Sequence, residues 1–273
     1  YKVFGKNERQ VIERLKAGES REELASLGTA AVIDVSFEVA KGETFVVMGL
    51  SGSGKSTLIR MINGLWSPSE GTVEVAGKVV SDMNDAQLRV LRRDHVSMVF
   101  QHFALLPHLT VRENAAYGLK LQGKLKQKER LEKANEWLNT VGLNGWGDKY
   151  PHQLSGGMQQ RVGLARALAA ETDILLMDEA FSALDPLIRR EMQDQLLELQ
   201  GALNKTIIFI THDLNEAMYL GDHIAVMRNG RVAQIGTSDE ILTQPADDYV
   251  ADFVQDVDRS RVLTASAVMR PTE

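Results

Sequence analysis

Apolar runs and helical patterns alternate along the chain, and their order predicts the fold. Four short runs rich in apolar and β-branched residues predict buried strands over 44–48, 96–100, 173–177 and 206–210. A long amphipathic helix is expected to begin at Pro186. Its predicted buried face comprises Met192, Leu196, Leu199 and Leu203. Strands that alternate with helices favour a mostly parallel sheet covered on both faces, so we expect an α/β fold.

Antiparallel elements are predicted beside that sheet. Asn229-Gly230, between two apolar runs, is a strong signal for a tight hairpin over 224–235. A second hairpin is expected over 71–78. Apolar and polar residues alternate between 31 and 39, which predicts a half-buried strand, and residues 1–5 are interpreted as the end of another.

Residues 6–30 have a different character, because they are polar and charged with a helical pattern. Val11, Ile12 and Leu15 form a short apolar stripe, and Ser20 with Glu23 has the spacing of a capping box before a second short helix. We interpret this segment as a helical insertion at the surface.

The segment from about 102 to 163 is predicted to be an inserted helical subdomain. Thr110 and Glu113 form a capping-box pattern before a helix to about Leu121. A further helix presents Leu131, Ala134, Leu138 and Val141 on one face. The Lys-rich run over 120–133 is more often a solvated face than a binding site, and we interpret it so.

Composition narrows the class of protein without identifying it. The chain has 273 residues, 44% of them hydrophobic and 25% charged, which is ordinary for a soluble globular protein. A net charge of −6 gives no basic footprint for nucleic acid, and the absence of Cys excludes disulfides and thiolate metal sites. No apolar run approaches the ~18 residues of a membrane span. We therefore expect a soluble, cytoplasmic protein.

Residues 49–57, Gly-Leu-Ser-Gly-Ser-Gly-Lys-Ser-Thr, match the phosphate-binding loop G-x-x-x-x-G-K-[ST] between a strand and a helix. Gly49, Gly52 and Gly54 allow tight turns and a close approach of backbone to ligand. Successive N–H groups and the following helix N-terminus then point at phosphates. Lys55 adds positive charge at the β/γ end, and the Ser56 hydroxyl is expected to bind Mg²⁺. The sequence predicts that the chain binds a nucleoside triphosphate.

Asp178-Glu179 follows the apolar strand predicted over 173–177. In an open α/β sheet that end of a strand faces the ligand crevice. Two adjacent acids there suit the binding of Mg²⁺ and the orientation of water, although by themselves they are as compatible with a helix cap.

Leu154-Ser-Gly-Gly-Met-Gln-Gln-Arg161 resembles the signature of ATP-binding-cassette (ABC) ATPases. The other motifs of that family are also present, in the same order along the chain as in the family: Gln101, Asp178-Glu179, Ser182-Ala-Leu-Asp185 and His212. The resemblance implies a P-loop NTPase (RecA-like) core with a mostly parallel sheet, an antiparallel β subdomain and an inserted helical subdomain. Met158 and Ala180 depart from the usual Gln and Pro. Both departures and the 6–30 insertion resemble the branch that imports glycine betaine, proline and related osmolytes.

The resemblance also implies roles for single residues. Phe4 would stack on adenine, where the alternative is an ordinary aromatic at a strand end. Glu179 would polarise the attacking water, with Gln101 sensing metal and water and His212 contacting the γ-phosphate. Asp178 would support Mg²⁺ with Ser56 and Gln101. The predicted ATP-binding residues are Phe4, Gly49, Ser51, Gly52, Ser53, Gly54, Lys55, Ser56, Thr57, Ser155, Gly156, Gly157 and Asp185.

The partners implied are a second copy of the chain, an integral membrane permease and, through it, a solute-binding protein. Two cassettes would face head to tail, with Ser155 and Gly157 of one subunit covering the ATP of the other and Asp185 bridging them. The apolar loop 103–109 would dock on the permease and hold the chain to the cytoplasmic face of the membrane, where the alternative is a loop that faces the core. The nucleotide-binding domain is expected over 1–236, and a helical extension over 237–273. Its Val268-Met-Arg-Pro271 resembles the lead-in to a cystathionine-β-synthase-type regulatory module.

Other classes remain open at this stage. The chain could be the ABC ATPase of another importer, or a soluble ABC ATPase acting on chromosomes or ribosomes. Against these soluble types, the chain has no long coiled-coil heptads, a single phosphate loop and no basic excess. A nucleotide sensor without turnover is a further alternative, which the presence of Glu179 and His212 disfavours.

Overall fold

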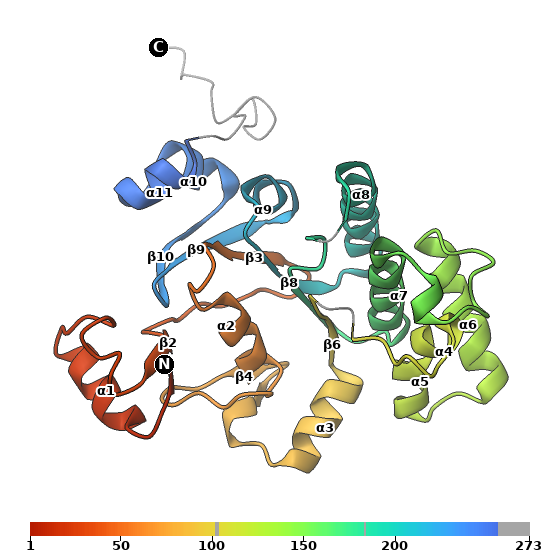
Figure 1. Ribbon diagram of the computed structural model, residues 1–273, viewed down its shortest axis with the longest axis horizontal. Coiled ribbons are helices and arrows are strands. Elements are labelled where there is room, and N and C mark those ends of the chain that lie inside the picture. The colour runs from red at the N-terminus through yellow and green to blue at the C-terminus, as the bar shows by residue number, and fades with distance from the viewer. Residues whose placement is uncertain (102–103, 183, 256–273) are drawn as a thin grey trace, which may run out of the picture. The chain divides into compact units, whose positions relative to one another are not determined.

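A computed structural model describes residues 1–101, 104–182 and 184–255 of the protein (Figure 1). The chain forms two compact units: one contains residues 1–82 and the chain from 210 onward, and the other contains 83–209. Among the helices of these described ranges, none is long and apolar enough to cross a membrane.

The first unit contains two small antiparallel pairs and a larger group of strands around β3. The small pairs are β1 (Lys2–Phe4) with β2 (Thr29–Val32), and β4 (Glu74–Val75) with β5 (Lys78–Val79). In the larger group β3 (Thr44–Gly49) pairs in parallel with β9 (His223–Arg228), which pairs antiparallel with β10 (Arg231–Gly236). The helical elements of this unit are α1 (Glu8–Lys16), α2 (Lys55–Ile62), η1 (Val80–Asp82), α9 (Leu214–Leu220), α10 (Ser238–Thr243) and α11 (Asp248–Phe253).

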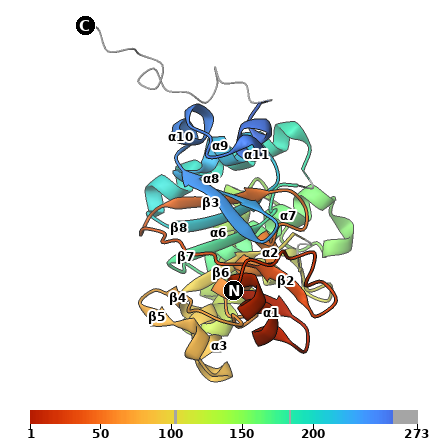
Figure 2. The same ribbon diagram turned by 90° about the vertical axis from the view of Figure 1, so that its left-hand side faces the viewer.

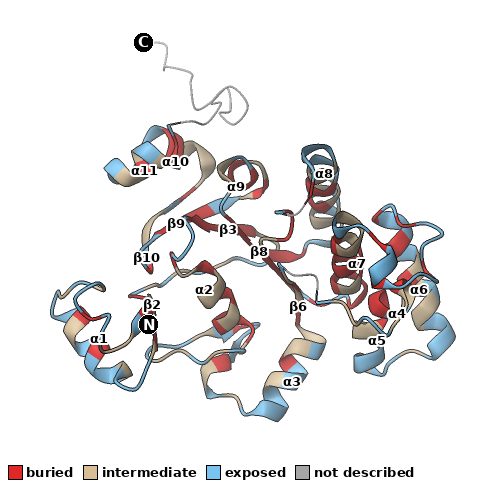
Figure 3. Cartoon of the chain, in the orientation of Figure 1, coloured by how far each residue is buried: buried red, intermediate tan, exposed pale blue. Residues whose placement is uncertain are grey.

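Burial explains why β3 is the centre of this unit. All six residues of β3 are buried, and α2 and α9 lie on opposite sides of the strand (Figures 1, 2 and 3). A continuous apolar strand of this kind is typical of a parallel sheet covered on both faces. The phosphate loop therefore begins at the carboxyl end of a fully buried strand.

The second unit is mostly helical. Its strands β6 (Val96–Val99) and β7 (Ile174–Asp178) pair in parallel. β8 (Thr206–Thr211) begins in this unit and ends in the first. The helical elements are α3 (Asp85–Asp94), α4 (Val111–Ala115), α5 (Tyr117–Gln122), α6 (Gln127–Thr140), η2 (Pro151–Gln153), α7 (Gly156–Ala169) and α8 (Pro186–Leu203). Helices α4, α5 and α6 pack against α7, which is largely buried (Figure 3).

Both predicted hairpins and all four predicted buried strands are confirmed, with small shifts at their ends. The capping box at Thr110 is also present, with Glu113 accepting from the Thr110 N–H at 2.8 Å. The helix that it starts is interrupted, however, and continues after Ala116 as α5.

Three predictions about single elements were wrong. Residues 33–39 do not continue a strand, because Asp34 has a φ of +53°, which breaks the extended backbone after β2. Residues 21–27 form turns and not a second helix, although Ser20 and Glu23 make the predicted hydrogen bonds. The last predicted core residue of α8, Leu203, is 44% exposed, because it lies in the final turn of the helix.

The insertion after β1 is more than a surface feature. Its stripe Val11, Ile12 and Leu15 is buried together with Leu24. These side chains pack with residues of the strand pair and the segment after it, namely Val3, Ala30 and Ile33 (Figure 2 shows α1 beside β2). The polar side chains of α1 face solvent, so the insertion is a small unit with its own apolar core.

Candidate functional site

The phosphate loop is pressed against neighbouring backbone at two glycines. A Cβ at Gly49 would lie 2.3 Å from the carbonyl oxygen of Met227, and one at Gly54 would lie 2.2 Å from that of Ala31. Both residues also have left-handed φ values, +147° and +103°. Because only glycine satisfies both conditions, these two positions fix the loop against β2 and β9.

Hydrogen bonds hold the loop in this shape. The N–H of Gly230, in the hairpin turn between β9 and β10, donates to the carbonyl of Ser53 at 3.0 Å, and the Ser53 N–H donates to the carbonyl of Leu50 at 3.2 Å. The first turn of α2 follows at once, with the Leu58 N–H donating to the carbonyl of Gly54 at 2.9 Å. The Ser53 hydroxyl is buried and has no hydrogen-bond partner within the described residues.

Lys55 lies across the loop and is only 4% exposed. Its ammonium donates to the carbonyls of Gly49 at 2.7 Å and Leu50 at 3.0 Å. The predicted residues Ser51 and Gly52 are exposed, while Ser56 and Thr57 are partly buried in the first turn of α2. The loop thus combines a fixed cation, a helix N-terminus and an exposed rim, which together suit an anionic ligand.

In the second unit, Gln101 and Glu179 come together. The Gln101 side-chain amide donates to the Glu179 carboxylate at 3.0 Å. Glu179 follows directly after β7, whose last residue Asp178 is buried, and has a left-handed φ of +48°. Its carbonyl accepts hydrogen bonds from the N–H and the hydroxyl of Ser182 at 3.2 and 2.9 Å. The sequence-predicted pair of acids therefore has one buried member and one partly exposed member.

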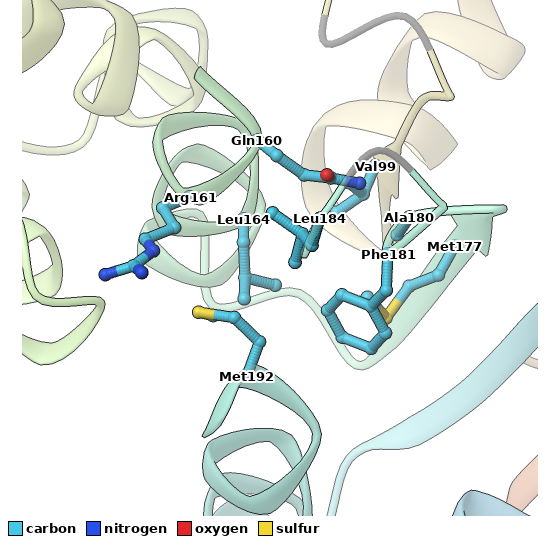
Figure 4. Close-up of a pocket in the computed structure, with 9 residues that line it drawn as sticks. All are labelled: Val99, Gln160, Arg161, Leu164, Met177, Ala180, Phe181, Leu184 and Met192. Atoms are coloured by element: carbon cyan, nitrogen blue, oxygen red, sulfur yellow. The ribbon is translucent and has the colours of Figure 1, made fainter. Parts of the chain in front are cut away.

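Ala180, which stands where the family usually has Pro, follows Glu179 and is buried. It lines a small apolar cavity with Val99, Gln160, Arg161, Leu164, Met177, Phe181, Leu184 and Met192 (Figure 4). The Gln160 amide is buried in this wall, and neither its nitrogen nor its oxygen has a partner among the described residues. The departure at Ala180 thus lies in buried apolar packing next to Glu179.

Ser155 and Asp185 both cap helices. The Ser155 hydroxyl accepts from the Met158 N–H at 3.3 Å at the start of α7, and Ser155 and Gly156 are exposed there. A Cβ at Gly157 would lie 3.1 Å from Leu184. Asp185 is exposed and accepts from the Ile188 N–H at 3.1 Å at the start of α8. Since Met158 contributes its N–H to the cap, that departure from the family pattern preserves the turn.

His212 and Phe4 belong to the first unit. His212 is exposed and follows β8, beside a turn in which the Thr211 hydroxyl donates to Glu216 at 2.6 Å. Phe4 packs edge-on against Trp66, with ring centroids 5.0 Å apart, and Lys2 lies 5.1 Å from the Phe4 centroid. Sequence reasoning missed Trp66 because no spacing links it to Phe4.

The predicted residues thus form two sets. Phe4, the phosphate loop and His212 belong to the first unit, and Gln101, Ser155 to Gly157, Asp178, Glu179 and Asp185 belong to the second. Ala183, in the Ser182–Asp185 motif, lies outside the described residues. Sequence reasoning also missed Arg21, a residue of the insertion whose guanidinium contacts the phosphate loop.

The fold and the phosphate loop define a P-loop nucleotide-binding protein of the α/β class. Residues 32–182 match the ABC transporter family, and the chain belongs to that family. The ATP-binding cassette MJ0796, solved as a dimer in a post-hydrolysis state bound to ADP and Pi, is 36% identical with a TM-score of 0.73. That similarity covers 76% of this chain and 90% of MJ0796, and it confirms the predicted ABC ATPase fold.

Curated relatives are similar over the whole chain. The glycine betaine transport ATP-binding protein OpuAA of Bacillus subtilis is 56% identical over 100% of this chain and 65% of its own length. The glycine betaine/proline betaine transport system ATP-binding protein ProV of Escherichia coli is 52% identical over 100% of this chain and 68% of its own length. The chain therefore spans about two thirds of the length of these relatives.

Proposed function

We propose that the chain binds and hydrolyses ATP as the energy-coupling subunit of an importer for osmoprotectants of the glycine betaine and proline betaine type. The observation that carries the proposal is the phosphate loop, where Gly49 and Gly54 admit no Cβ and Lys55 is held across the loop. The names of relatives that are 52–56% identical support the transport role and the class of solute.

The residues present fit a nucleotide with Mg²⁺. The closely packed loop, its buried Ser53 hydroxyl without a partner among the described residues and the Lys55 ammonium suit a polyphosphate. Within the described ranges no three His, Asp or Glu gather as a metal site. By the family resemblance, Ser56, Gln101 and Asp178 are the residues that would hold Mg²⁺ together with phosphate oxygens, and the ion would neutralise phosphate charge.

Hydrolysis needs charge neutralised around the transferred phosphoryl group and a water held in line, with little covalent help from the protein. Lys55 and the N–H groups of the loop would bind phosphate oxygens. Glu179 would orient the attacking water and accept its proton. Gln101, which donates to the Glu179 carboxylate at 3.0 Å, would hold that carboxylate in place. His212 would contact the γ-phosphate, and Phe4 would stack on the adenine.

The segment after Gln101 is the proposed contact with the permease, which would place the chain at the cytoplasmic face of the membrane. Phe103 lies outside the described residues, and Ala104, Pro107 and His108 are exposed. The buried Asn114 holds the segment by accepting from the Leu106 N–H at 2.8 Å and donating to the carbonyls of Leu106 and Leu109 at 3.0 and 3.1 Å. A solute-binding protein would act through the permease.

We also propose that two copies close around ATP, with Ser155, Gly156 and Gly157 covering the phosphates bound by the other copy and Asp185 at their interface. The dimeric state of MJ0796 supports this arrangement. The predicted domain bounds, 1–236 and 237–273, remain part of the proposal, and Val268 to Pro271 lie outside the described residues.

Substitution of Lys55 tests the proposal. Lys55→Ala removes the cation of the loop, and Mg²⁺–ATP binding or turnover should be lost while the circular dichroism spectrum is unchanged. Wild-type turnover by a well-folded Lys55→Ala protein would overturn the assignment of this loop.

A further inference from the structure

The insertion after β1 brings a cation to the phosphate loop. Arg21 donates from Nη1 to the carbonyl oxygen of Gly52 at 3.4 Å, across 31 positions of sequence. Gly52 belongs to the exposed rim of the loop, and Arg21 is partly exposed. The insertion therefore contacts the loop on the side that is open to a ligand.

The backbone around Arg21 is fixed by local hydrogen bonds. The carboxylate of Glu23 accepts from both the N–H and the hydroxyl of Ser20 at 2.8 Å, and these bonds hold the pKa of Glu23 below its usual range. Arg14 and Glu19 form an ion pair just before this turn, joined at 2.7 Å through the Arg14 Nε. Arg21 thus extends from a closed turn and not from a loose loop.

The apolar core of the insertion anchors this turn to the rest of the first unit. Leu24, three residues after Arg21, is fully buried with Val11, Ile12 and Leu15 against Val3, Ala30 and Ile33. The N–H of Ile33 donates to Gly230 at 2.7 Å, and the N–H of Gly230 donates to Ser53 in the phosphate loop. The insertion and the loop are therefore supported by the same backbone.

A guanidinium at this position suits phosphate. It carries five N–H donors in a planar fork that matches phosphate oxygens, and its contact with Gly52 uses one of them. Two acids close to Arg21 in sequence, Glu19 and Glu23, are engaged with Arg14 and Ser20. Lys55 is held inside the loop by the carbonyls of Gly49 and Leu50, so the two cations occupy different places.

We infer that Arg21 is a nucleotide-binding residue: the insertion supplies a second cation that binds the phosphates of ATP at the rim of the loop. This inference rests on the proposed function, and it assigns to the insertion a part in the nucleotide site.

Calorimetric titration of the whole chain with Mg²⁺–ATP tests the inference. Arg21→Met should weaken binding about tenfold, because a charge-assisted hydrogen bond is lost at a partly exposed site. Arg21→Lys should fall between Arg21→Met and the wild type, because it keeps the charge and loses the fork. The matched control is Arg9→Met, since Arg9 lies on the same insertion with a 94% exposed side chain and pairs with Glu13.

Arg9→Met should bind ATP as the wild type does, and the thermal midpoints of all variants should agree. Equal affinity of Arg21→Met and wild type would overturn the inference. An equal loss in Arg9→Met and Arg21→Met would also overturn it, because net charge alone would then explain the effect. Failure of the wild-type chain to bind ATP would instead overturn the proposed function.

Discussion

The side-chain amide of Gln101 donates a 3.0 Å hydrogen bond to the carboxylate of Glu179, although the two residues are 78 positions apart. Glu179 has a left-handed φ of +48°, a conformation that costs a non-glycine residue about 1–3 kcal/mol. The pairing of β6 and β7, which precede the two residues, brings them together. Because Gln101 lies just before the segment proposed to contact the permease, this bond would connect that segment to the carboxylate proposed to orient water.

Gln101→Ala should reduce ATP turnover about 10- to 100-fold, because the Glu179 carboxylate loses the group that orients it. Affinity for Mg²⁺–ATP should fall less than turnover does, because one proposed Mg²⁺ ligand is lost while the phosphate loop, Ser56 and Asp178 remain. Steady-state turnover and calorimetric binding measure the two quantities. Gln127→Ala, at an exposed position of α6, is the control and should change neither. Unchanged turnover in Gln101→Ala would mean that the hydrogen bond has no part in hydrolysis.

Leu105→Glu should block osmolyte uptake by the assembled transporter and leave ATP binding intact. Leu105 lies in the segment that Asn114 holds, and a charge there would oppose an apolar contact with the permease. The control Leu121→Glu introduces the same charge at a leucine that is 57% exposed in the same unit. Radiolabelled glycine betaine uptake in membrane vesicles distinguishes the two variants. Normal uptake by Leu105→Glu would exclude this segment as the contact.

Leu15→Ala should destabilise the insertion and the nucleotide site with it. Leu15 is fully packed in the core shared by α1 and β1, and truncation of a buried leucine costs about 2–5 kcal/mol. Leu121→Ala, at an exposed position, should cost less than about 0.5 kcal/mol. Thermal unfolding followed by circular dichroism compares them. If both variants melt like the wild type, the insertion core does not contribute to stability.

Local spacing was enough to predict the phosphate loop, the cap at Thr110 and the strand before Asp178. Those features depend on neighbours a few residues apart, such as the Thr110 hydroxyl accepting from the Glu113 N–H at 3.2 Å. The break after β2 could not be predicted, because the alternation of residues 31–39 gives no sign that Asp34 adopts a positive φ.

Contacts between residues far apart in sequence could not be predicted from local patterns either. The burial of Val11 and Leu15 depends on Val3 and Ile33. Arg21 contacts Gly52, and Trp66 contacts Phe4, across long stretches of sequence. The family resemblance supplied the candidates Gln101 and Glu179, but only the structure shows that they share a hydrogen bond. Tertiary packing decides such relationships, and short-range periodicity does not record it.

Glu179→Gln tests the hydrolytic role separately from binding. The variant should bind Mg²⁺–ATP, since Lys55 and Ser56 remain, and turnover should fall about 10²–10⁴-fold because the group that polarises water is lost. Glu198→Gln, at an exposed position of α8, makes the same chemical change away from the site and should hydrolyse ATP normally. Wild-type turnover by Glu179→Gln would show that another group activates the water.

Light scattering during size-exclusion chromatography of Glu179→Gln tests the closure of two copies around ATP most directly. The substitution removes a negative charge expected to face the γ-phosphate and prevents the hydrolysis that would release the subunits. With Mg²⁺–ATP the variant should elute with the mass of two chains, and with ADP it should have the mass of one. Adding Ser155→Arg, which places bulk at the exposed start of α7, should return the ATP sample to one chain. A single-chain mass for Glu179→Gln with ATP demonstrably bound would contradict the account.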